Sequence, residues 1–231
     1  MKVNEIFKSI QGESSFQGLP CVFVRLTGCN LRCSWCDTTY AYEEGEEMSV
    51  DEIIKKVEGY HTPLVEITGG EPLLQEEVYP LTKRLLDLGY KVLIETNGSL
   101  DIGRLDKRVI KILDIKCPGS GESDKMRWEN LDRLSPKDEV KFVLSNREDY
   151  QWAKGVIERY GLADRVTILL SVVYGRLDPK DLAQWILEDN LNVRLQLQLQ
   201  KYIWGASVNT EGTKNTEDTK GTEEHGKAWR V

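Results

Sequence analysis

Short apolar runs rich in β-branched residues alternate along the chain with longer segments whose apolar positions recur every three or four residues. The short runs predict seven strands, at Val22–Leu26, Leu64–Thr68, Lys91–Glu95, Val109–Ile115, Glu139–Leu144, Val166–Leu170 and Val193–Leu199. The longer segments predict four helices, at Val50–Glu58, Leu73–Leu88, Glu148–Tyr160 and Pro179–Glu188. Strands separated by helices form βαβ units, so we predict an α/β fold on a mostly parallel sheet. The pattern leaves open whether this sheet is doubly wound or a partial barrel.

The pattern changes near residue 206. From there to residue 227 the chain consists mainly of Thr, Glu, Lys, Gly and Asn, with almost no apolar position. A segment of this composition cannot bury enough surface to offset its ordering entropy. We therefore predict one folded domain over residues 1–204 and a polar, disordered tail over residues 205–231.

Composition narrows the class of protein. The net charge of −7 disfavours a nucleic-acid-binding surface, which is usually basic. No apolar run approaches the roughly 20 residues of a membrane span, and the N-terminus lacks the pattern of a signal peptide. Five cysteines, three of them clustered, fit poorly with a secreted disulfide framework. We expect a cytoplasmic protein that binds neither nucleic acid nor membranes.

The three clustered cysteines are the strongest chemical signal. Cys29, Cys33 and Cys36 have the spacing CxxxCxxC and offer three thiolates, whereas a structural zinc site needs four ligands. Of the other candidates, Cys21 begins a predicted strand and suits a buried apolar position, Cys117 is the best spare ligand but lies at a different strand end, and His61 and His225 fall in a predicted loop and in the tail. Three thiolates favour a [4Fe–4S] cluster in which one iron has no protein ligand. Such an open iron indicates chemistry rather than scaffolding.

The other polar motifs fall at the carboxyl ends of predicted strands, where parallel α/β folds place their functional loops. The motifs are Thr68-Gly69-Gly70-Glu71-Pro72, Glu95-Thr96-Asn97-Gly98, Asp114-Ile115-Lys116 and, just past the sixth predicted strand, Ser171. In the first motif, two glycines permit a sharp turn from strand to helix and Pro72 suits the first helical position. Because these ends share one edge of the sheet, we expect the motifs to meet at one rim.

The cysteine loop followed by the Gly-Gly-Glu-Pro turn resembles the radical S-adenosylmethionine (SAM) superfamily. The resemblance implies a partial (β/α) barrel with the cluster at the C-terminal rim of the strands. It also implies that the three cysteines hold a [4Fe–4S] cluster, that SAM binds the fourth iron, and that Gly70 lies against the SAM amino group. In that superfamily the reduced cluster cleaves SAM to a 5′-deoxyadenosyl radical. An electron donor of the flavodoxin or ferredoxin type is therefore implied.

The flanking residues are similar to the 7-carboxy-7-deazaguanine synthase family over roughly residues 1–204. The similar segments are Ser9-Ile10-Gln11-Gly12-Glu13, residues 18–32, Asp37-Thr38 and Lys201-Tyr202-Ile203-Trp204, the last resembling the end of the family's final strand. The resemblance implies ring contraction of 6-carboxy-5,6,7,8-tetrahydropterin to 7-carboxy-7-deazaguanine with loss of ammonia. This reaction belongs to the route to deazapurine nucleosides such as queuosine. A homodimer is expected by analogy.

The same resemblance implies roles for individual residues. Substrate contacts are expected from Ile10, Gln11, Gly12, Glu13, Arg25, Thr68 and Gln200. SAM contacts are expected from Gly70, Glu95, Asp114, Lys116 and Ser171. Thr38 matches the magnesium-binding threonine, and a Mg²⁺ ion commonly takes few protein ligands, with substrate oxygens completing its shell. The Arg25 guanidinium suits bidentate capture of a carboxylate.

Three departures from the family pattern lie toward the C-terminus. Gln200 stands where relatives commonly have histidine, and a glutamine cannot exchange protons near neutral pH. Ser171-Val172-Val173 replaces Ser-Pro-Val, and a Pro-containing ending with an Arg-Gly pair is absent. Two other functions stay open from the sequence. One is an activase that installs a glycyl radical on a partner protein, and the other is a non-catalytic iron–sulfur or zinc paralogue.

Overall fold

A computed structural model describes residues 1–205 of the protein, and its centre is a nine-stranded sheet. The strands are β1 (Lys2–Ile10), β2 (Pro20–Leu26), β3 (Glu46–Glu47), β4 (Leu64–Gly69), β5 (Lys91–Thr96), β6 (Ile110–Ile115), β7 (Glu139–Leu144), β8 (Thr167–Val172) and β9 (Arg194–Gln196). The α-helices are α1 (Val50–Glu58), α2 (Val78–Asp87), α3 (Arg147–Tyr160), α4 (Pro179–Glu188) and α5 (Leu199–Ile203). Within residues 1–205 no helix is both long and apolar enough to cross a membrane.

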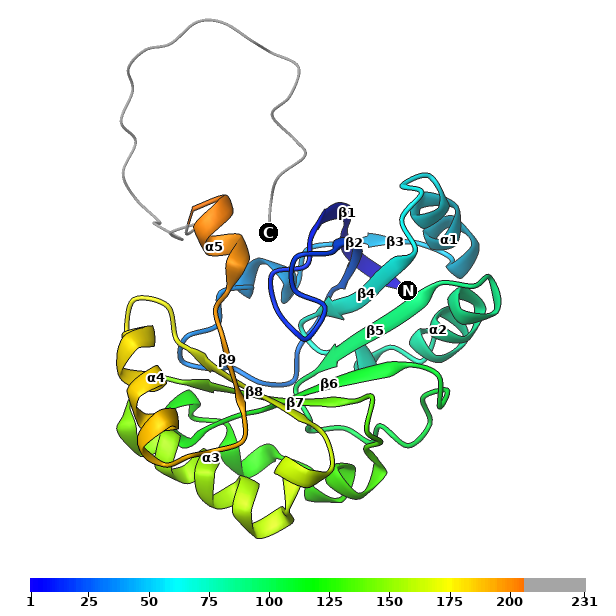
Figure 1. Ribbon diagram of the computed structural model, residues 1–231. Coiled ribbons are helices and arrows are strands. Elements are labelled where there is room, and N and C mark those ends of the chain that lie inside the picture. Colours follow the sequence, from blue (N-terminus) through cyan, green and yellow to red (C-terminus); the bar gives the residue numbers. More distant parts are fainter. Residues whose placement is uncertain (206–231) are drawn as a thin grey trace, which may run out of the picture.

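The strand order is β3-β1-β2-β4-β5-β6-β7-β8-β9. All pairs from β2 to β9 are parallel, whereas β1 is antiparallel to both β2 and β3. The sheet curves, with α1 to α4 along its convex side (Figure 1). Its two edge strands do not pair with each other in the described residues, so the sheet is open rather than a closed barrel.

The two faces of the sheet have different cores. The convex face carries the larger apolar cluster, in which residues such as Val24 and Ile67 pack with helical residues such as Leu85 and Ala153. The concave face carries a smaller cluster near the start of the strands, made of Cys21, Phe23, Leu64, Leu93, Ile110 and Ile112. Because side chains alternate along a strand, the next positions on this concave face are 25, 66, 95, 114 and 141.

Those next positions are Arg25, Glu66, Glu95, Asp114 and Lys141. Apart from Glu139 at the start of β7, the concave face is therefore apolar toward the amino ends of the strands and charged toward their carboxyl ends. Helix caps fix the surrounding scaffold. Ser49 and Glu52 form a reciprocal capping box at the start of α1, and Gly161 ends α3 in the left-handed conformation, with φ 56°.

The bounds predicted for α1, α4 and β7 are confirmed, whereas several other expectations are wrong. Strand β1 was not predicted, because its Lys, Asn and Glu residues obscure the strand pattern of an outer antiparallel strand. The helix predicted from Leu73 begins only at Val78 and is preceded by a short 3₁₀ helix, Pro72–Leu74. Ser171 lies inside β8 rather than past its end.

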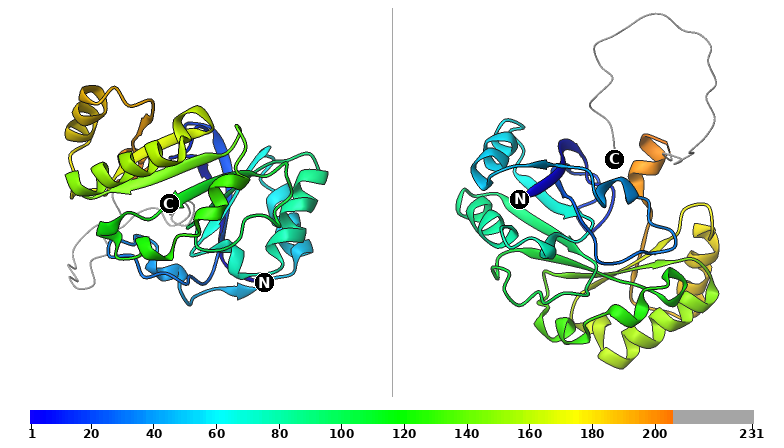
Figure 2. Two further views of the ribbon diagram at one scale, coloured as in Figure 1. Left: turned by 90° about the horizontal axis from the view of Figure 1, so that it is seen from below. Right: turned by 180° about the vertical axis from the view of Figure 1, so that it is seen from behind.

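The end of the described chain also differs from expectation. Residues 201–203, expected to end a final strand, belong to helix α5, and β9 stops at Gln196. Figure 2 shows α5 beside the mouth of the curved sheet, away from the convex helices. The predicted polar tail lies outside the described residues except for Gly205.

Candidate active site

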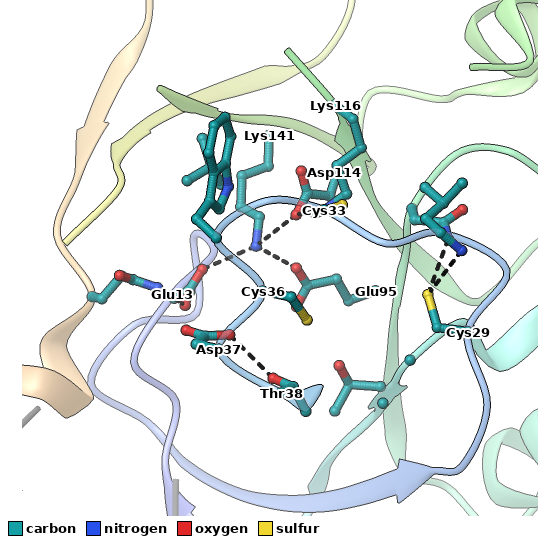
Figure 3. Close-up of a pocket in the computed structure, with 18 of the residues that line it drawn as sticks. Glu13, Cys29, Cys33, Cys36, Asp37, Thr38, Glu95, Asp114, Lys116 and Lys141 are labelled. Atoms are coloured by element: carbon teal, nitrogen blue, oxygen red, sulfur yellow. Dashed lines mark hydrogen bonds and ion pairs between the residues drawn. The ribbon is translucent and has the colours of Figure 1, made fainter. Parts of the chain in front are cut away.

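A pocket opens at the carboxyl ends of the strands, on the charged part of the concave face (Figure 3). The polar and cysteine residues that line it are Glu13, Arg25, Cys29, Cys33, Cys36, Asp37, Thr38, Tyr42, Thr68, Glu95, Asn97, Asp114, Lys116, Lys141, Gln198 and Lys201. Gly69, Gly70, Leu31, Trp35, Val143, Val173 and Tyr174 complete the wall. The pocket thus collects residues from the ends of most strands in the sheet, as the sequence predicted.

The cysteine loop follows β2 and is held to the scaffold by backbone hydrogen bonds. The Gly28 N–H donates to the Ala41 carbonyl at 2.9 Å, and the Ser34 N–H donates to the Ser120 carbonyl at 3.0 Å. A third bond, 2.8 Å long, runs from the Glu71 N–H to the Gly28 carbonyl. The Gly-Gly-Glu-Pro turn after β4 is therefore tied directly to the start of the cysteine loop.

The close approach of the Gly-Gly-Glu-Pro turn to the cysteine loop requires glycine at position 70. A Cβ atom at Gly70 would lie 2.1 Å from the Gly28 oxygen and 2.7 Å from the Cys29 Cβ.

Glu71 holds the same turn through its side chain. Its buried carboxylate accepts hydrogen bonds from the Leu73 N–H (3.0 Å), the Asn97 N–H (2.7 Å) and the Thr96 hydroxyl. Burial raises the pKa of Glu71 to about 7 despite these bonds.

The three loop cysteines are free thiols, each half-buried and lining the pocket. Cys29 Sγ accepts from the Leu31 N–H at 3.4 Å and from Asn97 Nδ2 at 3.8 Å. Burial raises the pKa of Cys33 to about 11, although the Lys116 ammonium opposes that shift. Within residues 1–205 no three Cys, His, Asp or Glu side chains are already gathered at metal-binding distance.

These residues fit an iron–sulfur cluster by their donor chemistry and surroundings. Three thiols on one short loop face a pocket, Gly70 leaves the loop's first cysteine uncovered by a side chain, and Lys116 supplies positive charge for thiolate ligands. The other two cysteines do not belong to the set. Cys21 is fully buried in the smaller apolar cluster, and Cys117 is 1% exposed in the larger one.

Lys141 lies at the centre of the charged floor. Its Nζ lies 3.0 Å from Glu13 Oε2 and 3.4 Å from Asp114 Oδ2, and it also pairs with Glu95 Oε1 (Figure 3). Burial alone would lower the pKa of Lys141, but the three carboxylates raise it well above its usual value. Asp114 shares its Oδ2 with Lys116 at 2.9 Å. The ammonium therefore stays charged and links three separate segments of the chain.

Glu13 is the carboxylate through which the C-terminal segment meets this floor. Its Oε1 accepts from Gln198 Nε2 at 3.1 Å and from Gln200 Nε2 at 2.9 Å. Burial would raise the pKa of Glu13, but Lys141 and these amides outweigh it and lower the pKa to about 2. Glu13 is therefore ionised at neutral pH and can accept hydrogen bonds from a ligand.

Arg25 projects from β2 into the same pocket and is only 8% exposed. Its Nε donates to Glu5 Oε1 at 2.8 Å, and its guanidinium lies 5.9 Å from the centre of the Phe7 ring and 5.8 Å from that of Tyr40. These contacts use one edge and the faces of the guanidinium. They fix the orientation of the guanidinium. A guanidinium with a fixed orientation is well suited to binding an anion.

Asp37 and Thr38 follow the last loop cysteine. Thr38 Oγ1 donates to Asp37 Oδ1 at 3.1 Å, and Asp37 Oδ2 pairs with Lys201 Nζ at 3.1 Å. The start of α5 is therefore attached to the pocket at two points, through Asp37 and through Glu13. Both attachments join residues more than 160 positions apart.

Some predicted site residues lie behind the pocket wall rather than in it. Of the residues expected to contact substrate or SAM, Ile10, Gln11, Gly12, Gln200 and Ser171 do not line the pocket. Gln11 Oε1 instead accepts from the Glu13 N–H at 3.1 Å, and its Nε2 donates to the buried Glu66. A Cβ at Gly12 would lie 1.8 Å from Gln200 Oε1. Gln11 and Gln200 therefore support Glu13 through hydrogen bonds rather than by lining the pocket.

Sequence reasoning missed Lys141, Gln198 and Lys201. Lys141 had a usable signal, because a lysine between Val140 and Phe142 interrupts a strand that should be apolar if both faces are covered. Gln198 and Lys201 had none that periodicity could supply. Their places depend on the turn of the chain from β9 into the short helix α5.

Comparison with known proteins was made against this geometry. A family model described as the radical SAM superfamily matches residues 23–186. The 7-carboxy-7-deazaguanine synthase of Koribacter versatilis (strain Ellin345) is 49% identical over 219 residues, which covers 88% of this chain and 97% of that protein. The protein of the same name from Chlorobaculum tepidum is 47% identical over 207 residues, with 88% and 94% covered.

Solved structures share the fold. The crystal structure of QueE from Escherichia coli matches with a TM-score of 0.68 at 25% identity, over 84% of this chain and 93% of that one. Streptococcus suis SuiB bound to its precursor peptide SuiA matches with a TM-score of 0.56 at 15% identity, over 78% of this chain and 49% of that one, a likeness of fold alone. These matches confirm the predicted partial (β/α) barrel.

Proposed function

The chain belongs to the radical SAM superfamily and, within it, to the 7-carboxy-7-deazaguanine synthases, and we propose that it converts 6-carboxy-5,6,7,8-tetrahydropterin to 7-carboxy-7-deazaguanine and ammonia. The observation that carries the proposal is the shared pocket, in which the three cluster cysteines lie together with Glu13 and Arg25. An ionised carboxylate and a fixed guanidinium suit a substrate that offers both N–H donors and a carboxylate.

Cys29, Cys33 and Cys36 would hold the [4Fe–4S] cluster, and SAM would bind beside it. When bound, cluster and SAM supply the radical that removes a hydrogen atom from the substrate. Gly70 leaves room for the SAM amino group, and Glu95 accepts hydrogen bonds from ribose hydroxyls. Asp114 and Lys116 belong to the SAM side of the site, whereas Ser171 lies inside β8, does not line the pocket and is assigned no direct contact.

The substrate side is formed by Arg25, Glu13 and Thr68. Arg25 binds the substrate carboxylate, while the Glu13 carboxylate accepts from the N–H groups of the pterin ring. Gln11, Gly12 and Gln200 keep Glu13 in place, and Ile10 ends the strand that leads to this turn. Product and ammonia together contain the atoms of the substrate, so the net reaction needs no external oxidant. Protein groups therefore orient the ring, exclude water and move protons.

Mg²⁺ binding is proposed at Thr38, whose hydroxyl faces the pocket from the end of the cysteine loop. One hydroxyl suffices because Mg²⁺ keeps several waters and takes substrate oxygens as further ligands. We also propose that the protein is a cytoplasmic homodimer that receives electrons from a flavodoxin or ferredoxin. Its product would enter deazapurine biosynthesis of the queuosine type.

The test is an anaerobic reconstitution. Protein loaded with iron and sulfide is mixed with dithionite, SAM, Mg²⁺ and 6-carboxytetrahydropterin, and mass spectrometry follows 7-carboxy-7-deazaguanine and SAM. We expect product in large excess over SAM consumed. A parallel reaction with EDTA in place of Mg²⁺ should form product more slowly.

Other outcomes would refute the proposal in different ways. 5′-Deoxyadenosine without the deazaguanine would indicate a radical enzyme acting on another substrate, such as a glycyl-radical activase. Neither product, in protein with a full complement of iron, would indicate a non-catalytic iron–sulfur paralogue.

A further inference from the structure

The roles assigned so far leave one buried cation of the pocket without a function. Lys141 has a side chain only 6% exposed, it projects from the middle of β7, and it lines the pocket. It faces carboxylates from three elements, namely Glu13 after β1, Glu95 near the end of β5 and Asp114 near the end of β6. All three carboxylates also line the pocket.

A second buried lysine shows that neutralising charge does not require this arrangement. Lys111 on β6 has a side chain 7% exposed and pairs with Asp138 at 3.0 Å, but neither residue lines the pocket. In that pair a single carboxylate neutralises the buried ammonium. Lys141 differs because it connects several carboxylates that belong to the site.

The connection joins the two ligand regions of the proposed enzyme. Glu13 belongs to the substrate side and Glu95 to the SAM side. The Lys141 ammonium contacts Oε2 of Glu13, and Gln198 and Gln200 donate to Oε1, so residues outside its own loop hold both carboxylate oxygens of Glu13. Glu95 has Lys141 as its ion-pair partner. One ammonium thereby sets the positions of both carboxylates.

We propose that Lys141 is a positioning residue that holds Glu13 and Glu95 on a single ammonium and thereby couples pterin binding to SAM binding. This inference rests on the proposed function. Within this arrangement, the first ligand to bind further restricts the remaining movement of the shared ammonium and of both carboxylates. The second ligand then meets an ordered acceptor and does not bear that ordering cost, so each ligand strengthens binding of the other.

The experiment measures this coupling by calorimetry on the anaerobic, reconstituted holoenzyme. The cluster is kept oxidised so that no turnover occurs. SAM is titrated without pterin and then with saturating 6-carboxytetrahydropterin. For the wild type we expect the pterin to lower the Kd of SAM by about tenfold, within the usual range of coupling between sites. In the Lys141→Met variant the ratio of the two Kd values should fall to about one, within twofold.

Two further variants separate positioning from support of the fold. Lys111→Met removes an equally buried ammonium outside the pocket, so it should lower stability yet keep the tenfold coupling. Lys141→Arg keeps a cation with several donors and should restore at least half of the coupling on a logarithmic scale. A purely structural role of Lys141 would give equal coupling in Lys141→Met, Lys111→Met and wild type, which would overturn the inference.

A second measurement serves if Lys141→Met does not fold, since it leaves three carboxylates unpaired. Glu95→Gln keeps Lys141 and relieves excess negative charge. With Glu95 neutral, Lys141 is drawn to Glu13, so pterin affinity measured without SAM should fall by about threefold or more. Unchanged pterin affinity would contradict coupling through Lys141. Failure of the wild type to bind the pterin at all would instead refute the proposed function.

Discussion

Arg25 lies on β2 with its guanidinium turned into the pocket, and neighbours on adjacent segments determine that direction. Glu5 on β1 accepts a hydrogen bond from the Arg25 Nε–H, and the rings of Phe7 and Tyr40 flank the guanidinium. Arg25 lines the pocket that also contains the cluster cysteines. A guanidinium held in this way can bind a carboxylate through a bidentate contact without a further loss of side-chain entropy.

Replacing Arg25 with alanine should therefore separate SAM chemistry from substrate chemistry. We expect Arg25→Ala to retain its iron and to cleave SAM slowly, while kcat/KM for the deazaguanine product falls by about 100-fold or more. Glu5→Gln is the matched control, because it removes the ion pair and keeps the guanidinium, and it should lose less than about tenfold. Wild-type turnover by Arg25→Ala would refute the substrate role of this residue.

Glu66 is the most unusual carboxyl of the concave face. It lies one layer below the pocket, is 4% exposed, and accepts a hydrogen bond from Gln11. Burial, followed by the negative charges of Glu95 and Glu13, raises the pKa of Glu66 to about 8. At neutral pH this residue is therefore mainly a neutral acid that keeps Gln11, and through it the Glu13 backbone, in position.

The raised pKa of Glu66 predicts a pH dependence of stability. Between the ordinary glutamate pKa and about 8, the folded protein keeps a proton that the unfolded chain has released. The free energy of unfolding should therefore fall as pH rises through this window, by up to about 1.4 kcal/mol per pH unit from this residue. Above that window the contribution of Glu66 becomes constant.

Glu66→Gln keeps the shape of the neutral acid and cannot ionise, so it should flatten this fall. Glu71, with its pKa raised to about 7, contributes in the same direction and should leave part of the slope in place. Urea unfolding of both proteins at several values between pH 5 and pH 8.5 would measure the difference. Parallel curves for the two proteins would show that Glu66 ionises normally in the folded state.

At the scale of elements, the sequence predicted those parts of the fold whose order is local. The α1 bounds follow from its capping box and three buried apolar residues, and the sequence predicted them correctly. The start of α2 and the helical end of the chain were not predictable in this way. Leu73 packs in the core from a 3₁₀ turn tied to Glu71, and α5 is held by contacts to Glu13 and Asp37. Such contacts override local propensity.

The turn between β4 and the following 3₁₀ helix should be highly sensitive to side-chain size. At Gly70 a Cβ would meet the backbone of Gly28 and the Cβ of Cys29, both below 3.0 Å. Gly70→Ala should therefore push the cysteine loop outward, and we expect less than about half of the wild-type iron after reconstitution.

Gly155 is the control for Gly70. It lies within α3, and a Cβ there would have no heavy atom within 4 Å beyond the adjacent backbone of its own helix. Gly155→Ala should raise the free energy of unfolding by about 0.5–1 kcal/mol and leave iron binding unchanged. Iron content measured per protein separates the two cases. Full iron loading of Gly70→Ala would show that the loop can move aside at little cost.

At the scale of the whole molecule, the sequence predicted where the site lies but not the ion pairs within it. Residues known from motifs, such as Cys29 and Glu95, reach the rim because parallel strands place their carboxyl ends together. The ion pairs among Glu13, Lys141 and Asp114 depend on side chains from β6, β7 and a distant loop. No spacing in the sequence encodes these contacts, because they arise from the curvature of the sheet.

The same architecture suggests that the folded barrel does not depend on its cluster. The larger apolar cluster is formed by the sheet with α1 to α4, and the cysteine loop is attached to it through backbone hydrogen bonds that need no metal. The three thiols are half-buried, so their replacement removes little packing. We therefore expect Cys29→Ser, Cys33→Ser and Cys36→Ser, combined in one variant, to keep the free energy of unfolding of the iron-free protein to within roughly 1–2 kcal/mol.

That triple variant should bind no iron–sulfur cluster and cleave no SAM, as measured by iron and sulfide content and by release of 5′-deoxyadenosine. Cys117→Ser provides the opposite case. Its thiol is 1% exposed in the apolar cluster, so a hydroxyl there should lower stability by about 1–3 kcal/mol while the cluster still forms. If the triple variant instead unfolds and Cys117→Ser fails to bind iron, the metal supports the fold and Cys117 is one of its ligands. The burial of the cysteines favours a fold that does not need the cluster and a cluster that does not need Cys117. Cys117 lies in the core, whereas the three half-buried cysteines face the pocket.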